Sequence, residues 1–210
     1  MNNITIGIVG RDEIKNNVTY QAITKNNIKY LHNKCNYIGI INYNNTDSID
    51  TDVLKLCDGI IIQGGIDIYN YHYDILDFAI NNNIPVLGIC MGHQIIGLYS
   101  TSKNENDLIE IKNHNDIDKL HNININKDSI LYNLFGDKIN VNSRHSYKLE
   151  KVNAPFKISA YSDDNVIEAI EYIDDKHFII GVQWHPEDMQ NMECLYNYFI
   201  KEIIIRKNTN

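Results

Sequence analysis

The segment that most constrains the fold is a five-residue turn, Gly88-Ile89-Cys90-Met91-Gly92, between two apolar runs. Residues 84–87 before the turn are typical of a buried strand, and residues 93–98 after it are compatible with a helix. Glycines on either side of the turn allow strand and helix to approach without Cβ clashes. The pattern predicts a nucleophile elbow with Cys90 at its apex, where the helix N-terminus favours a thiolate. The competing interpretation is a buried, unreactive cysteine.

The rest of the chain predicts the sheet around this elbow. Near-continuous apolar strands mark a parallel sheet covered on both faces, so we expect a three-layer α/β fold of flavodoxin-like type, with an antiparallel extension after the elbow. Residues 1–210 are expected to form one domain. The predicted strands are residues 4–10, 37–41, 60–63 and 84–87, then 108–111, 123–125, 139–142, 158–161, 167–172 and 178–182; the predicted helices are residues 19–32, 52–56, 73–81, 93–98, 129–134 and 189–205.

The composition argues against several classes of partner. With 19 basic and 27 acidic side chains the net charge is −8, which disfavours nucleic acid and anionic membrane surfaces. The four cysteines form no C-x-x-C pair and the histidines show no H-x-x-x-H spacing, so we expect no disulfide framework, no metal and no other cofactor. The chain has no apolar run long enough to span a membrane and no signal-peptide pattern, and we expect a cytoplasmic protein.

A second motif near the C-terminus supplies a partner for the thiol. The segment Gly181-Val182-Gln183-Trp184-His185-Pro186-Glu187 ends an apolar run. His185 and Glu187 are two positions apart, so in an extended segment their side chains point the same way. Glu187 would fix the tautomer of His185 while the other ring nitrogen faces Cys90, which is the nucleophile, base and orienter arrangement of acyl transfer. Taken alone, His185 would be interpreted as an ordinary surface or core histidine.

A glycine pair at the end of a neighbouring strand completes the predicted reaction centre. Gly64-Gly65 follows residues 60–63, and the carboxyl ends of parallel strands share one edge of the sheet. The backbone N–H groups of Gly65 and Met91 are therefore predicted to form an oxyanion hole for the developing charge. The alternative is that the two glycines only make a tight turn.

Five segments together resemble one known family. In chain order they are Gly64-Gly65-Ile66-Asp67, the GICMGHQ run ending at Gln94, Val141-Asn142-Ser143-Arg144-His145, Ile167-Glu168-Ala169 and the GVQWHPE segment. They are similar to class I glutamine amidotransferases, and within that superfamily to the stand-alone γ-glutamyl hydrolases typified by γ-glutamyl-γ-aminobutyrate hydrolase. The resemblance implies a Cys90–His185–Glu187 triad and a γ-glutamyl thioester. It also implies that Gln94 and the segment Ser143, Arg144 and His145 bind the glutamyl group.

The chain departs from the stand-alone hydrolases in one of these segments. Those relatives tend to read N-S-x-H-H-Q, whereas this chain reads Asn142-Ser143-Arg144-His145-Ser146-Tyr147. The amine half of the substrate is therefore expected to differ. Arg144 at a pocket rim suits a phosphate, so one hypothesis is a glutamine conjugate with a phosphoryl or nucleotide group on its amide nitrogen, as in capsule phosphoramidate biosynthesis. The other interpretation of Arg144 is a solvated charge.

Three functions remain open from the sequence. The preferred one is a free-standing hydrolase of a small γ-glutamyl amide. The second, which is not favoured, is a glutaminase subunit that supplies ammonia to a synthase. Because no synthase domain is fused here, that partner would have to be a separate chain. The third is a non-catalytic binding protein on the same scaffold, against which the intact Cys90, His185 and Glu187 argue. A general cysteine peptidase is disfavoured because Met91 stands where those enzymes tend to carry histidine. No oligomeric state is inferred.

Overall fold

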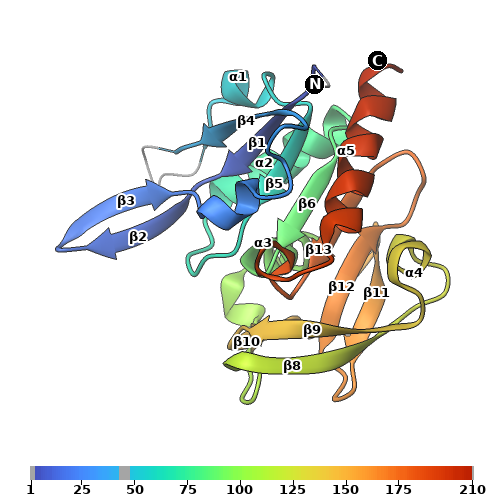
Figure 1. The fold of residues 1–210 in the computed structure, drawn as a ribbon. Helices are drawn as coiled ribbons and strands as arrows, with labels where there is room; N and C mark the ends of the chain where they lie inside the picture. The colour runs from blue at the N-terminus through green and yellow to red at the C-terminus, as the bar shows by residue number, and fades with distance from the viewer. Residues whose placement is uncertain (1–2, 43–47, 210) are drawn as a thin grey trace.

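The computed structural model describes residues 3–42 and 48–209. Within them, nine strands form one sheet in the order β4-β1-β5-β6-β13-β12-β11-β8-β9 (Figure 1). These strands are β1 (Thr5–Val9), β4 (Asn36–Ile40), β5 (Gly59–Ile62), β6 (Val86–Ile89), β8 (Asn115–Ile125), β9 (Lys138–Arg144), β11 (Phe156–Ser162), β12 (Ile167–Tyr172) and β13 (Ile179–Val182). Two smaller sheets pair β2 (Arg11–Lys15) with β3 (Val18–Ala22), and β7 (Ile109–Glu110) with β10 (Tyr147–Lys148).

The large sheet is parallel in its first half and antiparallel in its second. Strands β4, β1, β5, β6 and β13 pair in parallel. From β13 onward, β12, β11, β8 and β9 pair antiparallel. The predicted α/β class, with a parallel core and an antiparallel extension, is confirmed.

Helices cover both faces of the sheet, as side-chain alternation along buried strands requires. Ile61 packs into one core with Leu195, Phe199 and other residues of α5 (Glu193–Lys207). The neighbouring Ile60 and Ile62 pack into a second core on the opposite face. This second core contains buried side chains of α1 (Thr51–Leu54), α2 (Asn70–Asn81) and α3 (Met91–Tyr99). Helix α4 (Ile130–Phe135) and the 3₁₀ turns η1 (Lys25–Ile28), η2 (Glu105–Asp107) and η3 (Pro186–Asp188) complete the described elements.

One predicted helix is wrong. Residues 19–32 were expected to be helical, but β2 and β3 form a hairpin that extends from the body of the molecule (Figure 1), and only η1 follows it. The hairpin turn is Asn16-Asn17, whose φ angles are 53° and 61°. Asparagine tolerates positive φ, and two such residues give the turn twist that matches paired strands. This turn chemistry overrides the helix-compatible apolar spacing.

Among the described residues, no helix combines the length and the apolar character that crossing a bilayer would require.

Candidate active site

The elbow is formed as the sequence predicts. Cys90 lies between β6 and α3 with φ of 51°, a strained conformation for a residue with a side chain. Its N–H donates to the Val182 carbonyl at 2.8 Å, which ties the apex to β13. A Cβ on Gly92 would lie 2.1 Å from the Ile62 carbonyl oxygen, and one on Gly88 would lie 2.7 Å from the Gly92 carbonyl. Both glycines are therefore required by close backbone contact.

His185 and Glu187 form an ordered pair just beyond β13. His185 Nδ1 lies 2.7 Å from Glu187 Oε1, and the Glu187 side chain is buried. Because an ionised carboxylate only accepts hydrogen bonds, Nδ1 carries the proton and Nε2 is left for chemistry. Glu187 lies in η3, whose first residue is Pro186. The proline has no N–H to donate and suits the start of such a turn, so this short segment places acid and imidazole together.

Cys90 and His185 face each other across adjacent strands. Strands β6 and β13 are parallel neighbours with Ile89 opposite Val182. A Cβ placed on Gly64 would lie 2.7 Å from His185 Cε1 and 3.5 Å from Cys90 Cβ, so both side chains border the same point. Burial opposes protonation of His185, but hydrogen bonds and charge from Cys90 and Glu187 outweigh it and raise the pKa of His185 to about 10. The arrangement therefore places a protonated imidazole beside the Cys90 sulfur.

Two residues that the sequence analysis did not assign hold this centre in place. Asn142, on β9, accepts from the His185 N–H at 2.8 Å and donates to the His185 carbonyl at 2.9 Å. Gln183 is fully buried, and its Nε2 lies 3.6 Å from Cys90 Sγ. Asn142 and Gln183 occur in segments that carry the family resemblance. Their roles depend on contacts between strands far apart in the chain, which the spacing of residues within one segment cannot predict.

A cavity of about 740 Å³ opens beside the thiol. The predicted oxyanion residue Gly65 lines it, while Met91 is the first residue of α3, where a backbone N–H has no partner within the helix. Asp67 and Glu105 bring acidic groups to the same lining. The cavity therefore places the Cys90 thiol, a backbone donor and polar side chains around one space large enough for a small molecule.

The predicted substrate-binding residues divide into two groups. Gln94, Arg144 and His145 line the cavity. The Gln94 amide is oriented by donating to the Tyr147 carbonyl at 3.0 Å and to Gln183 Oε1 at 3.3 Å. Ser143, by contrast, is buried and does not belong to this lining: its hydroxyl donates to the His114 carbonyl at 2.7 Å.

Arg144 is not a free cation. Its Nη1 lies 2.5 Å from Asp188 Oδ2, on the turn that carries Glu187. Asp188 also accepts a hydrogen bond from Asn26 at 2.5 Å. Arg144 thus links the cavity wall to the turn that orients His185, and part of its charge is balanced within the protein.

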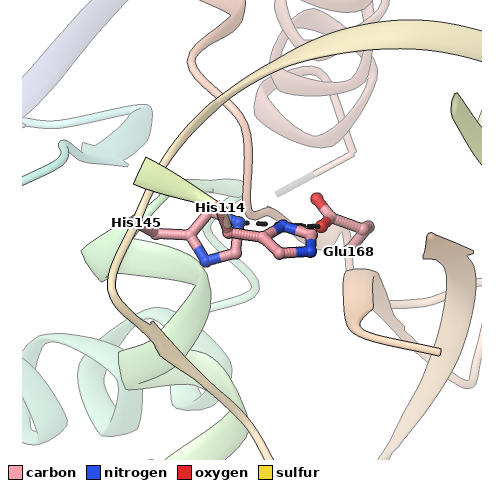
Figure 2. Close-up of side chains that lie close together, drawn as sticks. All are labelled: His114, His145 and Glu168. Atoms are coloured by element: carbon pink, nitrogen blue, oxygen red, sulfur yellow. Dashed lines mark ion pairs between the residues drawn. The ribbon is translucent and has the colours of Figure 1, made fainter. Parts of the chain in front are cut away.

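In the described part of the chain, two groups of histidine and acidic side chains lie close enough together that they could hold a metal ion. One consists of His185, Glu187 and Asp188, and so overlaps the proposed triad. The other, His114, His145 and Glu168, is buried (Figure 2).

Comparisons with known proteins identify the family and the fold. Residues 70–187 match the family model Peptidase C26. The glutamine-hydrolysing subunit of GMP synthase from Methanocaldococcus jannaschii is 32% identical over 161 residues, covering 75% of this chain and 80% of the relative. A solved structure from Thermoplasma acidophilum, provisionally described as a GMP synthase subunit, aligns with a TM-score of 0.70 at 18% identity, covering 100% of this chain and 98% of that one. The glutaminase domain of Trypanosoma brucei CTPS aligns with a TM-score of 0.67 at 17% identity, covering 97% and 94%.

Proposed function

Because this chain belongs to the Peptidase C26 family of class I glutamine amidotransferases, we propose that it is a glutaminase that hydrolyses the side-chain amide of glutamine and supplies the ammonia to a separate synthase. The observation that carries the proposal is Cys90, His185 and Glu187 gathered at one sheet edge. The relatives named as glutamine-hydrolysing subunits favour this function over the free-standing hydrolase preferred from the sequence.

The first half of the reaction acylates the enzyme. The Cys90 thiolate attacks the γ-carbonyl carbon, and the resulting oxyanion accepts hydrogen bonds from the Gly65 and Met91 N–H groups. When the intermediate collapses, the carbon–nitrogen bond breaks and His185 Nε2 gives its proton to the departing nitrogen. Ammonia leaves, and a γ-glutamyl thioester remains on Cys90.

The second half releases glutamate. His185, now neutral, takes a proton from a water molecule that attacks the thioester carbon. The carbon–sulfur bond then breaks, restoring the thiolate and the imidazolium. Glu187 holds the imidazole tautomer throughout and stabilises its positive charge. Gln94 and Arg144, which line the cavity, are the side chains that we assign to binding the glutamyl moiety. The expectation that His145 binds it is not carried into this proposal, because its side chain is buried and its ring nitrogens face the Tyr147 carbonyl and Glu168.

The purified chain tests the proposal with glutamine as substrate. We expect glutamate and ammonia in equal amounts, low turnover by the chain alone, and a rise of about tenfold or more when the synthase partner of the same organism is added with its own substrates. Cys90→Ser should abolish glutamate release while leaving the fold intact. Glutamine hydrolysis that survives in Cys90→Ser would overturn the proposal.

The free-standing γ-glutamyl hydrolase remains the second candidate, and the cavity volume favours it. A space of about 740 Å³ exceeds what a glutamine amide needs and leaves room for a larger amine. A panel of N-substituted γ-glutamyl amides, with mass-spectrometric detection of glutamate and amine, separates the two functions. Substituted amides that turn over faster than glutamine would favour this candidate.

The same panel can test the hypothesis that Arg144 binds a phosphoryl group on the leaving amine. Its pairing with Asp188 reduces the charge available to a phosphate. If the phosphoryl hypothesis holds, Arg144→Ala should impair turnover of phosphorylated amides more than that of neutral amides. Equal effects on both would discard that hypothesis and leave the glutaminase proposal untouched.

A further inference from the structure

Figure 2 shows a cluster of two imidazoles and one carboxylate, which is buried and includes His145 of the catalytic cavity's lining. Glu168, on β12, is fully buried, and His145 and His114 are almost so. His114 immediately precedes β8 and His145 immediately follows β9, so three distant parts of the chain meet here. From these contacts we propose that His114 Nδ1, His145 Nε2 and Glu168 Oε1 form a zinc site.

The distances suit a metal better than direct hydrogen bonds. Glu168 Oε1 lies 3.6 Å from His114 Nδ1 and 3.6 Å from His145 Nε2. Both separations exceed the usual hydrogen-bond range of about 2.7–3.2 Å. Two ligands of a tetrahedral zinc ion, with bonds of about 2.0–2.1 Å, are separated by about 3.4 Å. All three donor atoms lie within 4.8 Å of one another.

Two buried atoms in the cluster lack hydrogen-bond partners among the residues that the structure describes. They are His145 Nε2 and Glu168 Oε2. A buried polar atom without a partner is costly, and a carboxylate in an apolar interior even more so. A cation bound by His145 Nε2 and Glu168 Oε1 would give the imidazole nitrogen a partner and balance the carboxylate charge.

The outer contacts fix the tautomers that zinc binding requires. His145 Nδ1 lies 3.0 Å from the Tyr147 carbonyl, and His114 Nε2 lies 3.0 Å from Asp164 Oδ2. Since both partners only accept, those nitrogens carry the protons. The remaining nitrogen of His145, Nε2, presents its lone pair toward Glu168. His114 Nδ1 faces Glu168 as well but also lies 3.2 Å from Ser143 Oγ, so zinc would replace that contact. Histidine ligands of zinc are held in this way by a carboxylate or carbonyl on the second nitrogen.

Glu168 is oriented by a third histidine. His121 Nε2, on β8, lies 3.1 Å from Glu168 Oε1, within hydrogen-bond range. A ligating carboxylate that is itself hydrogen-bonded has the outer support found in metal sites. Two imidazoles and one carboxylate form a nitrogen-rich set that favours zinc over magnesium or calcium, which prefer oxygen ligands.

A second cavity borders the cluster at His114. It measures about 320 Å³, and its lining also includes His121, Ser143, Lys119 and the carboxylates of Asp163 and Asp164. The cavity also provides space for a water molecule as fourth ligand. A bound ion would join β8 and β12 to the segment around His145, whose neighbours Arg144 and Ser146 line the catalytic cavity. Zinc at this position would stiffen one wall of the active site.

The test uses full-length Cys90→Ala protein, so that the catalytic thiol contributes no ligand. After dialysis against zinc and then metal-free buffer, elemental analysis should find one zinc per chain. Cobalt substitution should give the visible absorption of a tetrahedral site without a sulfur charge-transfer band, since no cysteine belongs to the ligand set. Protein that retains no zinc, or a cobalt site with a sulfur ligand, would overturn the proposal.

Variants made in the Cys90→Ala background identify which residues bind the ion. His114→Ala and Glu168→Gln should each weaken zinc binding by about 100-fold or more, because each removes a ligand. His185→Ala is the matched control: it disrupts the other candidate group and should retain stoichiometric zinc. Circular dichroism checks that each variant folds, and the cobalt spectrum of Cys90→Ala alone decides if one does not. Zinc lost only in His185→Ala would refute the assignment. None of these readouts depends on catalysis, so failure here leaves the proposed glutaminase intact.

Discussion

The side-chain amide of Asn142 binds both backbone groups of His185. Its Oδ1 accepts from the His185 N–H at 2.8 Å, and its Nδ2 donates to the His185 carbonyl at 2.9 Å. Asn142 is on β9, at the edge of the sheet, whereas His185 follows β13 near its middle. Asn142 therefore positions the imidazole through the backbone of His185.

This clamp predicts the behaviour of Asn142→Ala. Both backbone groups of His185 lose their partners, which we expect to cost about 1–3 kcal/mol of unfolding free energy. A displaced imidazole should also lower kcat by about tenfold or more with little change in KM. Thermal unfolding and steady-state glutaminase assays measure the two effects. Asn142→Asp keeps the acceptor for the N–H and should lie between the variant and the native protein; native activity in Asn142→Ala would contradict the clamp.

Gly64 has no room for a side chain on the catalytic face. A Cβ there would lie 2.7 Å from His185 Cε1. Gly64→Ala should displace the imidazole and lower kcat by about 10²-fold without unfolding the protein. Gly39→Ala is the control, because its Cβ would meet only the flexible end of Ile23. The hypothesis fails if both variants lose activity equally.

Glu187→Gln tests the charge that orients His185. The glutamine retains an acceptor but removes the negative charge, so the pKa of His185 should fall from about 10. We expect kcat to decrease by about 10²–10⁴-fold. Proton NMR titration of the His185 ring follows the pKa independently of turnover. An unchanged titration with an unchanged rate would show that Glu187 does not act on the imidazole.

Thiol reagents should distinguish the four cysteines. Burial raises the pKa of Cys35 and of Cys57 to about 11, and it also raises the pKa of Cys194, so these three stay protonated near neutral pH. Cys90 lines the cavity and contacts the His185 imidazole, whose raised pKa keeps it protonated. Iodoacetamide should therefore modify Cys90 at least about tenfold faster than the others. Peptide mapping by mass spectrometry gives the four rates, and comparable rates would argue against an activated Cys90.

His72 makes the fold sensitive to acid. Its Nδ1 accepts the Tyr69 N–H at 3.0 Å at the start of α2, and burial lowers its pKa to about 4. Below pH 6.5 the unfolded chain binds a proton at this position that the folded chain excludes until about pH 4, so stability falls with falling pH across that window. By pH 5 the loss amounts to about 2 kcal/mol.

His72→Gln should remove this part of the acid sensitivity. Glutamine can still accept the Tyr69 N–H but does not titrate. Urea unfolding at pH 7 and pH 5 should show a smaller pH-dependent loss in the variant than in the native protein. Equal losses in both proteins would rule out His72 as a source of the effect.

The sequence by itself located the elbow, most of the strands and the three residues proposed for catalysis. Gly88, Gly92 and the positive φ of Cys90 belong to one segment of five residues. The steric constraints of such a short turn depend on neighbouring residues, so the local sequence is enough to predict it. His185 and Glu187 are likewise two positions apart, so their pairing is local. The apolar runs predicted the sheet because burial on both faces needs no long-range information.

Only the tertiary structure decided the rest. The strands at residues 11–22 pair because Asn16 and Asn17 form a hairpin turn with positive φ. The apolar spacing that follows this turn is compatible with a helix and led to the wrong prediction. The clamp of Asn142 on His185 joins residues 43 positions apart, and the cluster around Glu168 gathers side chains from three segments. Such contacts depend on strand order and register, which are set by the packing of the whole sheet and not by the spacing of any one motif.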